Sequence, residues 1–155
     1  MADMKKANAV YSTVIKAFKE LDWTYDEYKD DLVVVSGVKS EDLPIKFMIH
    51  IYAENQVIRL LSTLPFDVTE DKRIDLAIAV NHVNCQIIDG SFDYDIQKGE
   101  ISFRMTSSYM DSVISTELIK YMISIAAGTI DQYNDKLYFI SEGKLSIREF
   151  MDEND

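Results

Sequence analysis

Apolar residues recur every three to four positions across residues 7–21, while lysines and acids fill the positions between them. This spacing is typical of an amphipathic α-helix that packs one face against a core. We therefore expect an N-terminal helix whose buried stripe consists of Ala7, Val10, Tyr11, Val14, Ala17, Phe18 and Leu21.

The pattern then changes to a period of two, which is typical of half-buried β-strands. A short β-branched run spans residues 32–37, and the polar stretch 26–31 precedes it. Two alternating segments follow, with Pro65 expected to end the second. Short connections favour three antiparallel strands in a meander. In the first segment Ile45, Phe47, Ile49 and Ile51 alternate with Lys46, Met48, His50 and Tyr52. In the second, Ile58, Leu60, Ser62 and Leu64 share one face and Val57, Arg59, Leu61 and Thr63 the other, and we expect one face of the sheet to be buried.

A second helix is expected from about Glu70, with Thr69 as its cap and acids in its first turn. The predicted inward stripe contains Ile74, Ala77, Ile78, Asn81 and Cys85. Leu76, Ala79, Val80 and Val83 would lie on other faces, so this helix should be covered on more than one side.

Two further strands, around 91–96 and 101–106, flank the turn sequence Gln97-Lys98-Gly99 and predict a hairpin. A long helix should begin near Ser115, and Gly128 within it is interpreted as a mark of close helix packing. Its predicted buried stripe is Leu118, Met122, Ile125, Ala126, Thr129, Ile130 and Tyr133.

The last residues allow more than one interpretation. The apolar segment 137–140 either extends the long helix or runs separately. Ser146 and Glu149 have the spacing of a capping box, which predicts a short helix over 147–155. This tail is either a solvated end or a docking segment for a partner or a second copy.

The order of predicted elements is α-β-β-β-α-β-β-α. It indicates an α+β fold with one five-stranded antiparallel sheet packed by helices. No repeat or linker divides the chain, so we expect a single domain over 1–155, with a core of about 7–138 and a tail of 139–155.

Composition narrows the class of protein. The 155 residues carry a net charge of −11, and 47% of them are apolar, which is too high for a disordered chain. Excess negative charge disfavours nucleic acid and anionic membranes as partners. The single cysteine, Cys85, cannot form an internal disulfide, and we expect a cytoplasmic protein. The acids are densest in residues 22–43.

No residue pattern points to catalysis or to a cofactor. A calcium loop counted from Asp93 would place Lys98 and Arg104 at positions that require Gly and an acid. His82 and Cys85 could share a helix face, but His50 is distant in sequence and a zinc site needs more ligands. Phosphate-binding loops and a nucleophile elbow are also missing from the sequence. We predict no catalytic, cofactor-binding or metal-binding residues, with Cys85 a small buried side chain.

Taken together, these elements resemble the YbjN domain family of bacterial sensory transduction regulators, whose fold is similar to that of type III secretion chaperones. The resemblance covers about residues 7–138. It is carried by the three-strand meander of 32–64, the Leu64-Pro65 step before the second helix with Ala77, Val80 and Asn81, the hairpin segments Phe92-Asp93-Tyr94-Asp95 and Glu100-Ile101-Ser102-Phe103-Arg104, and the long helix from Ser115 to Tyr133.

The resemblance implies a protein-binding module without enzymatic activity, because secretion chaperones of this fold are small acidic dimers that bind extended partner segments through apolar grooves and strand addition. We expect a homodimer that contacts its second copy through the long helix or an edge strand. The candidate interface residues are Leu118, Tyr121, Met122, Ile125 and Tyr133. One alternative is a small-ligand sensor with a pocket between the sheet and the second helix. Another is an enzyme that carries none of the known local motifs.

Overall fold

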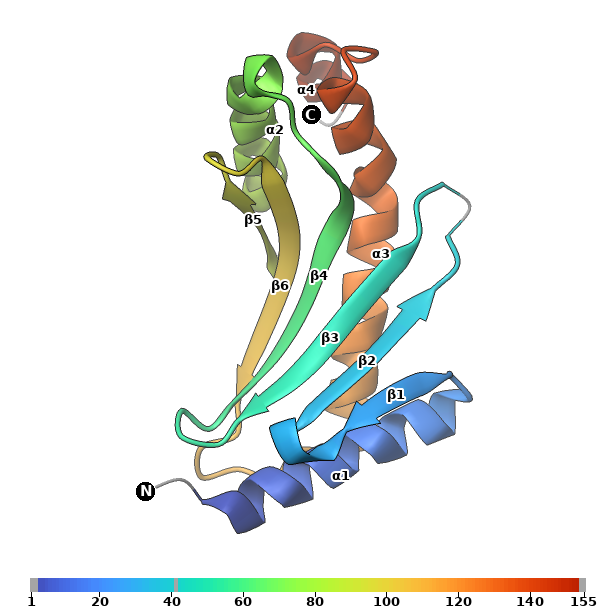
Figure 1. Cartoon of the computed structure of the whole chain (residues 1–155), viewed down its shortest axis with the longest axis vertical. Coiled ribbons are helices and arrows are strands. Elements are labelled where there is room, and N and C mark those ends of the chain that lie inside the picture. The colour runs from blue at the N-terminus through green and yellow to red at the C-terminus, as the bar shows by residue number, and fades with distance from the viewer. Residues whose placement is uncertain (1–2, 41, 154–155) are drawn as a thin grey trace.

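The computed structural model describes residues 3–40 and 42–153 (Figure 1). In chain order the elements are α1 (Met4–Leu21), β1 (Tyr25–Tyr28), η1 (Lys29–Asp31), β2 (Val33–Val38), β3 (Ile45–Tyr52), β4 (Val57–Asp67), η2 (Glu70–Lys72), α2 (Arg73–Gln86), β5 (Ser91–Asp95), β6 (Glu100–Ser108), α3 (Thr116–Ser141) and α4 (Ile147–Glu153).

The strands form one antiparallel sheet in the order β1-β2-β3-β4-β6-β5. The predicted α+β class with a single antiparallel sheet is therefore confirmed. The described sheet has six strands rather than the expected five. The additional strand, β1, lies in the stretch that we interpreted only as polar, and it pairs with β2 at the edge of the sheet. An edge strand that is mostly exposed has no reason to alternate apolar and polar residues, so its sequence carries no strand pattern.

Strand β4 is longer than predicted because it continues through Pro65 to Asp67. Its pairing with β6 shifts register between Thr63 and Asp67. Proline has no N–H for the ladder, so it is found in strands mainly at edges and irregularities. The register shift is such an irregularity. Pro65 therefore interrupts the regular pairing with β6 at this point but does not end the strand.

The core lies on one face of the sheet. The buried strand residues are Ile45, Phe47, Ile49, Ile51, Ile58, Leu60, Ser62 and Leu64, and the α1 stripe from Ala7 to Phe18 is buried as well. The two faces differ sharply in cover: α3 runs behind the sheet in Figure 1, while the other face of the central strands is turned toward the viewer. An ion pair of 2.6 Å between Lys120 Nζ on α3 and Glu20 Oε2 on α1 joins the two helices at the rim of the core.

The buried face of α2 differs from the predicted one. The structure buries Leu76, Ala79, Val80 and Val83, whereas Ile74 and Ile78 are 65% and 43% exposed. Asn81 and Cys85 are exposed as well. Since α2 is apolar around much of its circumference, periodicity alone does not distinguish one face from the other. Which face of α2 is buried depends on how the helix packs against β5 and α3.

At the other end of the chain, α3 continues to Ser141, so the 137–140 segment extends the long helix. Gly128 does not mark close packing within this chain, because it is exposed and a Cβ added there would meet no atom within 4 Å. The capping box is present: Glu149 N–H donates to Ser146 Oγ at 3.2 Å, and Ser146 N–H donates to Glu149 Oε2 at 3.0 Å.

The short α4 is attached to the rest of the molecule. Phe150 is fully buried, and its ring lies 6.1 Å from that of His82 on α2. The tail up to Glu153 is therefore docked on its own chain. Across the described residues, no helix combines the length and apolar character required to cross a membrane.

Candidate functional site

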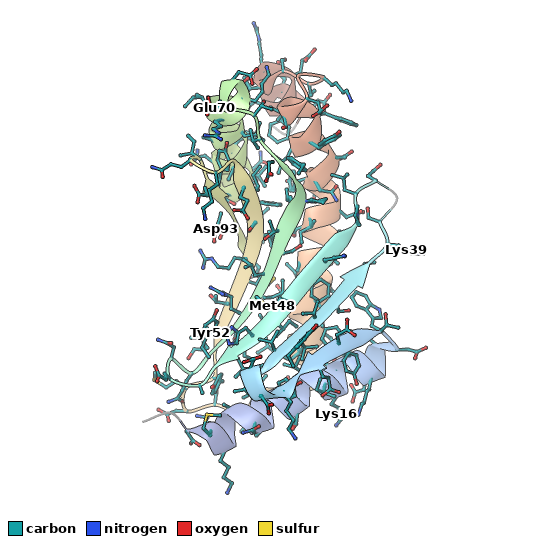
Figure 2. All side chains as sticks on the ribbon, viewed as in Figure 1. Lys16, Lys39, Met48, Tyr52, Glu70 and Asp93 are labelled. Carbon is teal, nitrogen blue, oxygen red and sulfur yellow. The ribbon has the colours of Figure 1, made fainter. Side chains whose placement is uncertain are left out.

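The uncovered face of the central strands is the most distinctive surface of the molecule. We call it the open face and define it by the outward residues of β2, β3 and β4, which alternate with the buried ones. These residues are Val33, Val35, Lys46, Met48, His50, Tyr52, Val57, Arg59, Leu61 and Thr63. Two of them, Met48 and Tyr52, are labelled on this side in Figure 2.

An apolar row crosses the middle of the open face. The sheet register aligns Val35 with Met48 and Met48 with Leu61, so the three side chains are cross-strand neighbours. They line a shallow hollow of about 230 Å³ together with Lys46 and Thr63. Each is only half-buried, because no helix of the described chain lies over them. The row therefore presents contiguous apolar surface that the monomer leaves in contact with water.

Beside this row, an arginine is held by aromatic stacking. The Arg59 guanidinium lies 4.8 Å from the centroid of the Tyr52 ring, a cation–π geometry. His50 stacks on the same tyrosine, with ring centroids 3.9 Å apart. Burial, together with the positive charge of Arg59, lowers the pKa of His50, so the imidazole is neutral at pH 7. The three side chains fix the position of the guanidinium on the sheet.

Arg59 has no carboxylate partner among the described residues, and its buried Nε makes no hydrogen bond there. Arg104 on β6 is different. Its Nε donates to Asp93 Oδ2 at 2.6 Å and its Nη2 to Asp93 Oδ1 at 3.1 Å, which is a bidentate ion pair. That pairing raises the pKa of Arg104. Of two arginines on this side of the sheet, Arg104 is neutralised and Arg59 is not.

One edge of the sheet, at β5, is closed by a side chain. The side chain of Asn84, on α2, occupies the outer edge of β5: its Nδ2 donates to the Phe92 carbonyl at 2.9 Å, and its Oδ1 accepts from the Phe92 N–H at 2.8 Å. Both backbone groups that an added strand would need at Phe92 are therefore satisfied. Asn84 was not singled out by the sequence, in which it is one of two asparagines in α2.

The predicted interface residues on α3 divide into two sets. Met122 and Tyr133 are buried in the core of the monomer. Leu118 and Ile125 are partly buried, and Tyr121 is 48% exposed and donates a hydrogen bond to Asp89. Tyr121 and Ile125 line a hollow of about 370 Å³ whose opposite wall is the loop after α2. Ile88 in that wall is 98% exposed.

The residues considered for metal or nucleophilic chemistry do not converge. His50 lies on the open face of the sheet and His82 on α2 beside Phe150. Cys85 is exposed, which contradicts the prediction of a buried cysteine and follows from the different register of α2. Within 3–40 and 42–153, no cluster of three or more histidine, cysteine, aspartate or glutamate side chains could hold a metal ion.

The sequence carried one overlooked signal for the open face. Residues 57–61 of β4 are apolar apart from Arg59, so this strand has apolar residues on both of its faces. Val57 and Leu61, like Met48 on β3, occupy positions where a solvated face would have polar residues.

This architecture defines a class: a small α+β domain with helices on one face of an antiparallel sheet and an open, partly apolar second face. The family model described as "YbjN: Putative bacterial sensory transduction regulator" matches residues 11–139. The chain therefore belongs to the YbjN family, as the sequence resemblance indicated. None of the curated proteins matches it by sequence.

Solved structures with the same fold include the following two. One is YbjN from E. coli, described as a putative transcription regulator, with a TM-score of 0.62 and 13% identity over 85% of this chain and 92% of that one. The other is the ExsC–ExsE complex, with a TM-score of 0.60 and 12% identity over 88% of this chain and 97% of that one. The expected likeness to the fold of type III secretion chaperones is thus confirmed.

Proposed function

We propose that this protein is a non-enzymatic, cytoplasmic protein-binding module that acts as a regulator or chaperone and functions as a homodimer. The observation that carries the proposal is the apolar row of Val35, Met48 and Leu61, which the monomer leaves uncovered. Contiguous apolar surface of this kind on a folded domain is typical of interaction sites. Membership of a family of regulators, and a fold shared with a protein solved in complex with another, support the proposal.

The test uses a partner captured from the source cells with tagged protein, then purified and titrated back. We expect a stoichiometric complex that is weakened by the double substitution Met48→Ser and Leu61→Ser. The matched control is Ile74→Ser with Ile78→Ser, which removes exposed apolar surface from α2 instead. Loss of binding in the control but not in the open-face variant would contradict the assignment of the site.

For the dimer, we propose that the second copy packs on the surface of α3 around Leu118, Tyr121 and Ile125, beside the hollow that Ile88 borders. Light scattering should give twice the 17.8 kDa of the chain. Ile88→Glu should shift the protein toward monomer, because a charge would be buried in the contact. Val113→Glu is the control, since Val113 is 97% exposed in a different loop. A 17.8 kDa particle at high concentration contradicts the dimer.

The alternative of a small-ligand sensor gains no supporting observation. The α2 residues that face the sheet are Leu76, Ala79, Val80 and Val83, and all four are buried in the core. Phe92 and Phe103 pack edge to face beneath them, with ring centroids 5.0 Å apart. The space in which a ligand would have to bind is occupied by side chains.

A further inference from the structure

The middle of the open face carries positive charge at Arg59, although the whole chain is negative. The molecule carries 27 acids and 16 Lys and Arg residues. The open-face residues include Lys46 and Arg59, whereas acids on this side of the sheet lie at its margins, with Asp26 on β1 paired with Val35 and Asp67 at the end of β4. Asp31, in η1 at the rim, is the acid that acts on His50 there, and it is the weakest of the three influences on that histidine. The region around Arg59 therefore favours a negatively charged group of an occupant.

The Arg59 side chain is preorganised to bind a carboxylate. Its guanidinium is fixed over Tyr52, so little side-chain freedom remains to be lost on binding. Its Nε is buried without a hydrogen-bond partner, whereas the neighbouring Arg104 is already satisfied by Asp93. A guanidinium in this state gains a bidentate, charge-assisted contact when a carboxylate reaches it.

The spacing of the sheet then specifies the shape of the occupant. Arg59 and Leu61 are two residues apart on β4, so their side chains stand about 6.6–6.8 Å apart along the strand. An extended peptide presents alternate side chains on one side with the same period of two residues. A segment lying along β4 can therefore place an apolar side chain on the Val35–Met48–Leu61 row and a carboxylate on Arg59.

We infer that the open face binds an extended segment of a protein partner in which an apolar residue and an Asp or Glu are separated by one residue, the carboxylate pairing with Arg59 and the apolar side chain packing on Val35, Met48 and Leu61. This inference rests on the proposed function and names the chemistry of the partner. A strand added at the β5 edge would have to displace Asn84, so docking on the face is favoured over augmentation at Phe92.

The experiment is a selection of random peptides displayed on phage against the purified full chain. Enriched peptides should contain an acid two positions from an apolar residue. The strongest binder, made synthetically, should bind Arg59→Gln about tenfold or more weakly, since a hydrogen-bonded charge pair is lost. Lys16→Gln, on the exposed side of α1, makes the same change in net charge and should leave affinity unchanged. Amide shifts on titration should fall on β3 and β4.

Several outcomes would overturn the inference: no enriched peptide, enriched peptides without the spaced acid, equal affinities for the Arg59 and Lys16 variants, or amide shifts confined to α3, the expected contact of a second copy.

Failure of this inference can be distinguished from failure of the proposed protein-binding function. If the captured partner needs Met48 and Leu61 but binds Arg59→Gln as well as the unaltered chain, the partner chemistry is wrong and the protein-binding function stands. If neither variant affects the partner, the site itself is wrong.

Discussion

At the scale of single residues, Tyr11 shows how burial and charge act together. It lies on α1, is buried, and donates a hydrogen bond from its hydroxyl to Glu27 Oε2 on β1 at 3.3 Å. Burial, followed by the negative charge of Glu27, raises the pKa of Tyr11 to about 12 from 10.0. The folded state therefore holds the phenolic proton more tightly than the unfolded state does.

This pKa predicts a loss of stability in alkaline solution. Below pH 10 the phenol is protonated in both the folded and the unfolded state, and its contribution to the free energy of unfolding is fully present. That contribution declines as the pH rises from about 10 to about 12. The stability lost over this range is at most about 2–3 kcal/mol, because solvent screens part of the interaction. In Tyr11→Phe this part of the pH dependence should be missing. Urea unfolding of both proteins between about pH 9 and 12 checks it. A constant difference in unfolding free energy across that range would refute the prediction.

At the scale of elements, the edge strand β5 depends on α2 for its protection. The two hydrogen bonds between Asn84 and the Phe92 backbone tie the strand to the helix and close its edge. Buried polar groups that lose their partner are costly, and an unprotected strand edge is a template for pairing between chains.

We therefore expect Asn84→Ala to destabilise the protein by about 1–3 kcal/mol and to promote self-association. Urea unfolding gives the first quantity, and light scattering against concentration gives the second. Asn81→Ala on the same helix is the control, because Asn81 is exposed. If both variants behave alike, the edge bonds do not have the protective role assigned to them.

The terminal helix α4 is short, so its stability depends on its packing. A helix of this length is marginal alone in water, and Phe150 is its buried anchor. Phe150→Ala should cost about 3–5 kcal/mol and expose the amides of α4 and of the facing part of α2 to hydrogen exchange. Arg148→Ala, on the exposed side of α4, should leave exchange unchanged. Unaltered protection in the Phe150 variant would show that α4 docks by other contacts.

At the scale of the whole molecule, the charge of −11 opposes folding through repulsion among exposed acids. Salt should therefore stabilise the protein, because the Debye length falls from about 30 Å at 0.01 M to about 3 Å at 1 M. Urea unfolding at increasing NaCl measures the effect.

The control for this effect neutralises part of the charge. The variant with Asp26→Asn, Asp30→Asn and Asp31→Asn changes exposed acids only and leaves Glu27 with Tyr11. It should show a weaker rise of unfolding free energy with NaCl. An equal rise in both proteins would mean that salt acts through apolar burial instead of charge.

The sequence by itself determined the order of the elements apart from the edge strand β1, the alternation of the central strands and the buried stripe of α1. These are local periodic patterns, and a period of two or 3.6 residues specifies a face whenever only one face is apolar. Where both faces are apolar, as in α2 and β4, the pattern is ambiguous. There the tertiary structure decided that Leu76 faces inward and Ile74 outward, and that Leu61 stays uncovered.

The candidate site depended on tertiary structure even more. Arg59 is an ordinary basic residue in the sequence, and it becomes distinctive only because Tyr52 stacks on it and no described acid pairs with it. Likewise, the apolar row exists because strand register aligns Val35, Met48 and Leu61 across three strands. Cross-strand register and the choice of which sheet face the helices cover are properties of the packed chain, and no local pattern encodes them.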